Sequence, residues 1–360
     1  MIKFIEYQIT QLYKKINLYM SLKKNKVLII AEAGVNHNGS IKVAKKLIDI
    51  ATNAGSDIVK FQTYKTENLI TKNAPKANYQ KKTTNTNETQ FQMLKKLEFT
   101  EKDHAILIDY CNKKNIEFLS SPFDLPSIDL LKKFKLKRIK IPSSELTNHI
   151  YLKKISSFRG EIIFSTGMSS MKEIRDVYNF LIKNGVKKKK ISILHCNSDY
   201  PTKFKDVNLR SMQLIKKTID VNIGYSDHSI GSEVPIAAVT LGAKIIEKHF
   251  TIDKKMDGPD HKVSLDPKEL KYMIKCIRNV EESLGKSNRI LSKNVIDNIK
   301  THTKSIVASK PIAKGEKFSL NNLTVKRPGT GLNAKFYMKL INKKSNRNYK
   351  ADDLISKKEL

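Results

Sequence analysis

Short apolar runs rich in β-branched residues recur along the chain, and polar or turn-forming residues separate them. Each run has the length and composition of a buried strand. The predicted strands are Val27–Ala31, Ile58–Phe61, Ile116–Ser120, Arg138–Ile141, Glu161–Ser165, Ile191–His195, Val221–Tyr225 and Ile245–His249. Most of the intervals show the apolar spacing of an amphipathic helix. The predicted helices are Ile41–Ala54, Glu101–Lys114, Ser127–Phe134, Met171–Asn184, Leu209–Thr218 and a segment between Gly231 and Gly242.

This alternation predicts an α/β fold. Eight strands that alternate with helices over about 250 residues are typical of a (β/α)8 TIM barrel. An open doubly wound sheet is the alternative, but no GxGxxG pattern follows the first strand. In a barrel we expect the functional residues at the carboxyl ends of the strands.

Both ends of the chain differ in composition and sequence pattern from this barrel-like region, which spans residues 27–284. Residues 1–26 are lysine-rich and interrupted by polar residues, so we interpret them as an N-terminal extension, with Met20 as an alternative start. Residues 285–303 resemble a linker with a helical piece. Residues 304–360 alternate strand-like runs with turn signals, which predicts a small β-rich domain.

One connection inside the barrel region is unusually long. Residues 65–97 are polar, and Lys81 to Thr89 are nearly all Lys, Thr and Asn. Loops of this length in compact domains are usually functional lids or disordered segments. Because the segment follows the second strand, we expect it to lie over the mouth of the barrel.

Composition excludes some classes of protein. The chain has 68 Lys and Arg against 35 Asp and Glu, but only eight of the basic residues are Arg, and the lysines are spread along the sequence without a nucleic-acid-binding motif. We therefore expect no nucleic acid partner and only mild steering of anionic substrates. No apolar run approaches the roughly 18 residues of a membrane span.

The cysteines and the start of the chain bear on the compartment. Cys111, Cys196 and Cys276 are odd in number and far apart, which favours a reducing environment. The first 26 residues lack the continuous apolar stretch and cleavage site of a signal peptide. Together these features predict a cytoplasmic protein.

Two histidines end consecutive predicted strands, in Gly224-Tyr-Ser-Asp-His228 and Glu247-Lys-His249. A strand, helix, strand connection makes the two strands parallel, so both imidazoles would lie at the same end of the sheet. That arrangement suits a divalent metal with open coordination positions. The alternative is a pair of hydrogen-bonding histidines in the core.

Other polar residues gather at the same strand ends. They are Glu32, Asn36, His37 and Asn38; Lys60 and Gln62; Ser120 and Ser121; Lys140, Ser143, Ser144 and Glu145; Ser165 and Thr166; His195, Asn197 and Ser198; and Ser226. Lysines with hydroxyl donors suit a phosphate or another polyanion. Glu32 is a candidate general base, with an ion pair to Lys60 or Lys140 as the structural alternative. Cys196 beside His195 could suggest a thiol nucleophile, but adjacent strand residues face opposite sides, so packing is the preferred interpretation.

The motifs in this order resemble those of the sialic acid synthases, which condense phosphoenolpyruvate with an N-acetylated mannose-type sugar. The matching stretches are Ala31-Glu-Ala-Gly-Val-Asn-His-Asn-Gly39, Val59-Lys-Phe-Gln-Thr63, Lys140-Ile-Pro-Ser143, Ser165-Thr-Gly-Met168, His195 to Thr202, Gly224 to His228, Glu247-Lys-His-Phe250 and Gly258-Pro-Asp-His261. The tail from Lys304 resembles the antifreeze-like SAF domain that ends these enzymes, with Val325-Lys-Arg-Pro328 as its marker.

The resemblance implies a role for each matching residue. It implies that His228 and His249 hold a divalent ion, usually Mn²⁺, with Mg²⁺ or Co²⁺ as alternatives. Phosphoenolpyruvate would contact Lys60, Ser121, Lys140, Ser143, Ser165, Ser198 and Ser226. The sugar would lie among Glu32, Gln62, Tyr200 and Asp260, although a Gly-Pro-Asp loop is also consistent with a plain turn. Arg327 would reach the N-acetyl group from the tail of a partner chain in a domain-swapped homodimer.

The expected activity follows from the resemblance. We expect N-acetylneuraminate synthase activity with N-acetylmannosamine as acceptor. The alternative is N,N'-diacetyllegionaminate synthase activity with 2,4-diacetamido-2,4,6-trideoxymannose, and a remoter alternative is a lyase that forms a Schiff base through Lys60 or Lys140. Ser144, Ser121 and Ser198 depart from common residues of the family, but each is small or keeps a donor.

Overall fold

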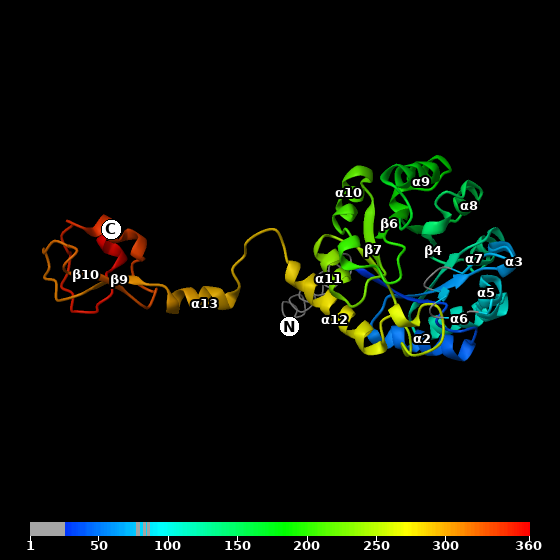
Figure 1. Cartoon of the computed structure of the whole chain (residues 1–360). Coiled ribbons are helices and arrows are strands. Elements are labelled where there is room, and N and C mark those ends of the chain that lie inside the picture. Colours follow the sequence, from blue (N-terminus) through cyan, green and yellow to red (C-terminus); the bar gives the residue numbers. More distant parts are fainter. Residues whose placement is uncertain (1–25, 77–79, 82–83, 85–86) are drawn as a thin grey trace, which may run out of the picture. The chain divides into compact units, whose positions relative to one another are not determined.

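The eight predicted strands form one parallel sheet that curls into a nearly closed barrel (Figure 1). They are β1 (Leu28–Gly34), β2 (Ile58–Thr63), β3 (Glu117–Pro122), β4 (Arg138–Ile141), β5 (Glu161–Ser165), β6 (Ile191–Cys196), β7 (Asn222–Asp227) and β8 (Ile245–His249). The hydrogen-bonded order is β3-β2-β1-β8-β7-β6-β5-β4. Its two end strands, β3 and β4, also lie in contact. The computed structural model describes residues 26–76, 80–81, 84 and 87–360.

Alternation along the strands separates the inside of the barrel from its outside. Six apolar side chains fill the interior, one from each of six strands: Ile30, Ile58, Leu119, Ile163, Leu194 and Ile245. The larger outer core lies between the strands and the surrounding helices. A residue two positions after an interior residue faces the interior again, closer to the mouth. This register supplies Glu32, Lys60, Ser121, Ser165, Cys196 and Glu247.

Helices follow the strands as the sequence predicts, with ends that shift by a few residues. The barrel helices are α2 (Ile41–Ala54), α6 (Glu101–Lys113), α7 (Leu125–Lys133), α8 (His149–Ile155), α9 (Met171–Lys183), α10 (Arg210–Ile219), α11 (Glu233–Thr240) and α12 (Pro267–Leu284), and the short 3-10 turns are η1 (Ser143–Glu145), η2 (Lys188–Lys190), η3 (Phe204–Asp206) and η4 (His261–Val263). Several begin at capping boxes, in which the side chain of Thr100, Ser170 or Asp266 satisfies free N–H groups of the first turn. Helices α8 and α12 were not predicted.

The long segment after β2 is partly helical, where the sequence suggested only a polar loop. It contains α3 (Thr66–Leu69) and α5 (Gln90–Leu97). The capping box of Thr89 and Gln92 starts α5. Val35, Tyr64, Met93 and Leu97 form a buried apolar cluster that is distinct from the barrel core.

Residues Lys286–Leu360 form a second compact unit, separate from the unit that ends at Gly285. It contains α13 (Lys293–His302), the antiparallel pair β9 (Ser305–Ala308) and β10 (Leu323–Lys326), α14 (Tyr337–Leu340), and the turns η5 (Ala334–Phe336) and η6 (Lys357–Glu359). Its own core includes Ile306, Phe318 and Leu340. Two of the predicted strand-like runs are therefore strands.

Two sequence predictions concern other parts of the chain. The proposed extension and the alternative start at Met20 lie outside the described residues. In the part of the chain that the structure describes, no helix is both long and apolar enough to span a membrane.

Candidate active site

Four charged side chains meet inside the barrel mouth, and all are nearly inaccessible to solvent. Lys60 Nζ lies 2.9 Å from Glu32 Oε2 and 3.6 Å from Glu247 Oε2. Lys140 Nζ lies 2.9 Å from Glu247 Oε1. The two ammonium groups are thus balanced by two carboxylates. The ion pair of Glu32 with Lys60 is the structural alternative that the sequence left open.

The two carboxyl groups of this site differ in pKa. Burial, the largest cause, raises the pKa of Glu32 to about 7, with Glu247 adding to the rise and Lys60 opposing it. Burial would also raise the pKa of Glu247, but Lys140 and Lys60 outweigh it and lower that pKa. Glu247 is therefore ionised at neutral pH, whereas Glu32 can hold or release a proton there.

Hydroxyl groups surround the two lysines. Lys60 Nζ donates to Ser121 Oγ at 3.2 Å, and Ser226 Oγ donates to Glu247 at 2.8 Å. Ser165 Oγ is buried and has no hydrogen-bond partner in residues 26–76, 80–81, 84 and 87–360. Because lysines and unused hydroxyls are groups that bind phosphate oxygens, this part of the mouth suits an anion.

Two more of the predicted serines lie beside Gly167. The backbone N–H of Gly167 donates to Ser143 Oγ at 2.8 Å. A Cβ at Gly167 would lie 2.6 Å from Ser198 Oγ and 3.1 Å from Ser143 Oγ. The missing side chain therefore leaves room for both hydroxyls at the mouth.

The histidine pair has the properties of metal ligands. The imidazole rings of His228 and His249 have centroids 5.5 Å apart. Burial lowers the pKa of His228 to about 4 and holds that of His249 well below its ordinary value, so both rings are neutral. His228 Nδ1 contacts Asn197 O, which leaves Nε2 as the acceptor of the Tyr200 hydroxyl at 2.7 Å.

A divalent ion fits this donor set. His249 Nδ1 is buried, and no described residue forms a hydrogen bond with it. Within the described chain, no cluster of three or more His, Cys, Asp or Glu residues is arranged to hold a metal. A bound ion would therefore take two imidazole ligands from this protein and keep positions for water and substrate.

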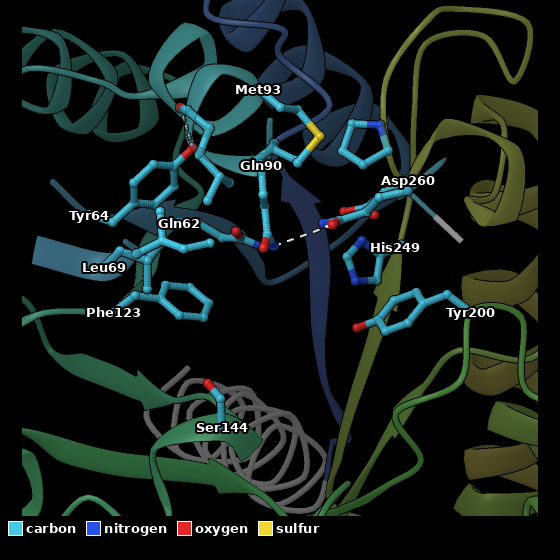
Figure 2. A pocket seen from close by; sticks show the side chains of 15 residues that line it. Gln62, Tyr64, Leu69, Gln90, Met93, Phe123, Ser144, Tyr200, His249 and Asp260 are labelled. Carbon is cyan, nitrogen blue, oxygen red and sulfur yellow. Dashed lines mark hydrogen bonds between the residues drawn. The ribbon is translucent and has the colours of Figure 1, made fainter. Parts of the chain in front are cut away.

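A cavity of about 310 Å³ opens from His249 toward the long segment after β2. Figure 2 shows Tyr200, His249 and Asp260 on one side and Tyr64, Leu69 and Phe123 on the other, with Gln62 and Gln90 between them. Burial raises the pKa of Asp260 to about 6, and its Oδ1 has no hydrogen-bond partner within the described part of the chain. The cavity therefore has one polar side and one apolar side.

The structure corrects parts of the sequence analysis. Ser120 faces outward and donates to Phe61 O, and His195 also faces outward, where its Nε2 contacts Val207 O. Cys196 faces inward, with Sγ 3.7 Å from His228 Nδ1, but it does not pair with His195. Arg327 follows β10 in the second unit and is exposed there.

Sequence reasoning missed Glu247 as a site residue. It lies two positions before His249 on β8, so the two-residue period of a strand already places both on the same face. The same reasoning missed the cavity residues of α5. Gln90, Met93 and Leu94 have the three- and four-residue spacing of one helix face.

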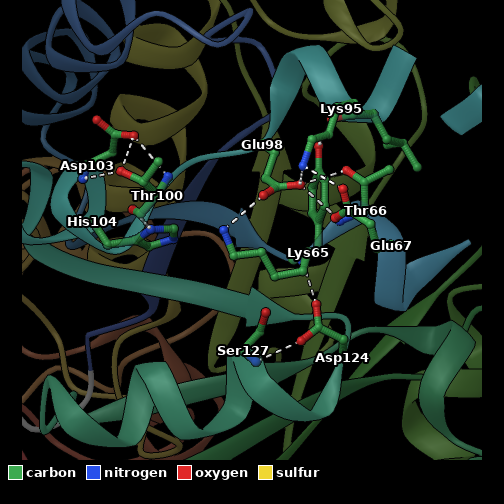
Figure 3. Close-up of polar contacts among 12 residues, drawn as sticks. Lys65, Thr66, Glu67, Lys95, Glu98, Thr100, Asp103, His104, Asp124 and Ser127 are labelled. Carbon is green, nitrogen blue, oxygen red and sulfur yellow. Dashed lines mark hydrogen bonds and ion pairs between the residues drawn. The ribbon is translucent and has the colours of Figure 1, made fainter. Parts of the chain in front are cut away.

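The segment after β2 is anchored by Glu98 (Figure 3). Its carboxylate accepts hydrogen bonds from Thr66 N at 3.0 Å, Thr66 Oγ1 at 2.9 Å and Lys65 Nζ at 2.9 Å. Asp124 accepts from Lys65 N at 2.6 Å. Burial would raise the pKa of Glu98, but the bonds from Thr66 and Lys65 outweigh it and lower the pKa to about 2.

We expect Glu98→Gln to loosen the start of this segment. Amide hydrogen exchange should quicken in α3, and the free energy of unfolding should fall by about 1–3 kcal/mol, because hydrogen bonds to a charged acceptor are replaced by weaker ones. Since the pKa of Glu98 is lowered in the folded state, its contribution is present above pH 4.5 and is lost as the pH falls toward 2. Glu67→Gln is the control, since Glu67 contacts Lys95 and lies on the surface of the same helix. Equal effects of the two changes would contradict the anchor.

Comparison with known proteins gives consistent matches. Residues 47–289 match the NeuB family, and residues 303–360 match the SAF domain. The chain is 51% identical over 330 residues to N,N'-diacetyllegionaminic acid synthase of Campylobacter jejuni, which covers 92% of this chain and 99% of that protein. It is 43% identical over 307 residues to the Legionella pneumophila protein of the same name, covering 84% and 86%. The structure resembles N-acetylneuraminic acid synthetase from Leptospira borgpetersenii, with a TM-score of 0.67, 33% identity, and coverage of 76% and 90%.

Proposed function

Because this chain belongs to the NeuB family and is a condensing transferase that joins phosphoenolpyruvate to a sugar to give a nonulosonic acid, we propose that its acceptor is 2,4-diacetamido-2,4,6-trideoxymannose. The product would be N,N'-diacetyllegionaminate. The observation that carries this choice is the 51% identity to a legionaminic acid synthase over nearly the full length of both proteins. It favours the alternative of the sequence analysis over N-acetylmannosamine.

We assign phosphoenolpyruvate to the lysine and serine end of the mouth. Lys60 and Lys140 would offset the charges of its phosphate and carboxylate, and hydroxyls would hold the remaining oxygens. The serines in this role are Ser121, Ser143, Ser165, Ser198 and Ser226. Support comes from the buried hydroxyl of Ser165, which has no hydrogen-bond partner among the residues that the structure describes.

The acceptor would lie beside this anion site, in the cavity. Gln62, Tyr200 and Asp260 line that cavity. Glu32 lies beside it, because a Cβ at Gly34 would lie 3.2 Å from Glu32 Oε1, 3.4 Å from His249 Cε1 and 3.5 Å from Gln62 Nε2. The methylene carbon of phosphoenolpyruvate bonds to the aldehyde carbon of the open-chain sugar, and the electrons of the C=O π bond pass to the aldehyde oxygen. Water adds to the phosphate-bearing carbon, the carbon–oxygen bond to phosphate breaks, and phosphate leaves with the electron pair of that bond. One proton of the water goes to the aldehyde oxygen and the other leaves with phosphate; the ionised form of Glu32, whose pKa is about 7, can accept the first of them from the water.

The family is metal-dependent in general. A divalent ion held by His228 and His249, with Mn²⁺ as our first choice, would polarise the aldehyde as a Lewis acid. The imidazoles suit that role because burial keeps them neutral. Asn197 O would keep His228 in a fixed orientation through Nδ1, and an ion on Nε2 would take the place of the Tyr200 hydroxyl there.

We expect phosphoenolpyruvate to bind more tightly as the pH falls from about 8 to 6. Its negative charge raises the pKa of Glu32 further, so binding takes up a proton. Calorimetric titrations without metal or sugar would measure this affinity. Glu32→Gln is the control, because it removes the titrating carboxyl group. In this variant the affinity should change with pH only as far as the titration of phosphoenolpyruvate itself requires. An unchanged profile in that variant would contradict the assignment.

We propose that Arg327 reaches the 2-acetamido group from the second unit of a partner chain in a domain-swapped homodimer. Arg327→Ala should raise the KM for the sugar about 10- to 100-fold while leaving the KM for phosphoenolpyruvate nearly unchanged, because the proposed contact of Arg327 is with the acetamido group of the sugar and not with phosphoenolpyruvate. Steady-state kinetics with each substrate varied would measure both constants. Lys326→Ala is the control, since Lys326 is an adjacent exposed cation that contacts Asp352. Equal losses for both substrates would count against the role of Arg327.

The deciding experiment measures phosphate release from phosphoenolpyruvate with Mn²⁺, with each candidate sugar in parallel and with a chelator as control. Chelator-sensitive release that is faster with the 2,4-diacetamido sugar is the expected result. Faster release with N-acetylmannosamine would overturn the choice of acceptor. Borohydride trapping of pyruvate on a lysine would instead support the lyase alternative.

A further inference from the structure

The apolar side of the cavity comes from three separate parts of the chain. Leu69 ends α3, Met93 lies on α5, and Phe123 follows β3. These residues belong to the small cluster that also contains Tyr64. Figure 2 shows Leu69, Tyr64 and Phe123 facing His249 and Asp260 across the cavity. We call Leu69, Met93 and Phe123 the apolar wall.

The apolar wall offers a ligand almost no hydrogen bonds. Its side chains have no N–H or O–H donors. The nearby hydroxyl of Tyr64 is already used, because it donates to Leu94 O at 3.1 Å. The ring of Phe123 lies edge-on to the ring of Tyr64, with centroids 6.5 Å apart. A sugar hydroxyl that contacts this wall would give up its hydrogen bonds to water without forming new ones to the protein, whereas a methyl group has no such hydrogen bonds to give up.

Amide groups lie beside the apolar wall. Gln90 Nε2 donates to Gln80 Oε1 at 3.3 Å, and Gln62 also lines the cavity. Gln90 precedes Met93 by three residues, so both project from one face of α5. A carboxamide both donates and accepts hydrogen bonds, as the acetamido group of a sugar does. This side of the cavity therefore combines a carboxamide that can hydrogen-bond to an acetamido group with an apolar surface.

We infer that this side of the cavity reads carbons 4 and 6 of the acceptor: the apolar wall receives a methyl group at carbon 6, and Gln90 binds an acetamido group at carbon 4. The inference rests on the proposed function, since it concerns the same acceptor. It adds the residues that discriminate between sugars. Reaction chemistry at carbon 1 stays on the opposite side of the cavity, beside His249.

Four acceptors test the two parts separately. They are 2-acetamido mannose with hydroxyls at carbons 4 and 6, its 6-deoxy form, its 4-acetamido form, and the form that has both changes. For the unchanged protein we expect kcat/KM to rise about tenfold or more for each change, which is the scale of discrimination that a pocket achieves for one small group.

Leu69→Asn places a hydrogen-bonding side chain of similar size in the apolar wall. The preference for the 6-deoxy sugar should fall about tenfold, while the preference at carbon 4 stays the same. Phe123→Tyr is the second variant, and it should shift the preference in the same direction. Leu69 is only half-buried, so the protein should still fold.

Gln90→Leu tests the other part. The preference for the 4-acetamido group should fall about tenfold, while the preference at carbon 6 stays the same. The KM for phosphoenolpyruvate should be unchanged in every variant. Leu214→Asn on the exposed face of α10 is the matched control and should change neither preference.

The outcomes separate this inference from the proposed function. A chain that favours the 2,4-diacetamido-6-deoxy sugar but keeps both preferences in all three variants would overturn the inference and leave the proposed function standing. A chain that favours the sugar with hydroxyls at carbons 4 and 6 would overturn the proposed function. Independent shifts at the two carbons would support both.

Discussion

Replacing His249 by alanine should abolish phosphate release and metal retention together. The imidazole is buried and neutral, and its Nδ1 has no hydrogen-bond partner among the described residues, so it is available as a ligand. With one of two protein ligands gone, Lewis-acid stabilisation worth several kcal/mol would be lost, which corresponds to about 10³-fold or more in kcat. His228→Ala should have the same effect. Metal content after gel filtration and phosphate release would be measured on the same samples.

His195→Ala is the matched control for this pair. His195 is also a buried imidazole at the end of a barrel strand, but it faces outward and contacts Val207 O. Its loss should lower the free energy of unfolding by about 1–3 kcal/mol without removing activity. Retained metal or retained activity in His228→Ala or His249→Ala would refute the metal site.

Lys140→Met should reduce kcat/KM for phosphoenolpyruvate about 10³-fold and also destabilise the protein. Lys140 is buried and pairs with Glu247, so its removal leaves two carboxylates facing one remaining ammonium group. Breaking a buried pair by removing one partner typically costs about 3–5 kcal/mol of stability. Denaturant unfolding and steady-state kinetics would measure the two effects.

The double variant Lys140→Met/Glu247→Gln separates these effects. It restores the charge balance, because Lys60 and Glu32 remain paired at 2.9 Å. Much of the lost stability should return, whereas activity should not, since the anion site still lacks one lysine. Recovery of activity together with stability would mean that Lys140 serves only the fold.

The candidate site was predictable in part because strands have a regular period. Glu32, Lys60 and Ser121 each follow an interior apolar residue by two positions, so a strand assignment alone puts them in the barrel. The same rule applies to Glu247, which sequence reasoning nevertheless passed over. It also excludes His195, whose neighbour Cys196 faces inward. Site residues were therefore misassigned where only their nearness to a strand end was considered, and not the face of the strand on which they lie.

The family resemblance implied roles for loop residues, which the periodicity of strands and helices does not place. Tyr200 and Asp260 lie in loops, where side-chain direction has no simple repeat. Only the fold brings Tyr200 to His228 and buries Asp260 in the cavity. Arg327 lies in the second unit, and its role stays a prediction.

By itself, the sequence determined the barrel, its eight strands and the polar character of its mouth, because these follow from local periodicity and from the rule that parallel strands end on one side. The tertiary structure alone decided which charges are paired and what encloses the acceptor cavity. Pairing among Glu32, Lys60, Lys140 and Glu247 joins four separate strands, and burial sets the pKa of Glu32 near 7. The apolar wall likewise joins residues far apart in the chain. Distances between such residues depend on how the whole barrel closes, which no local pattern encodes.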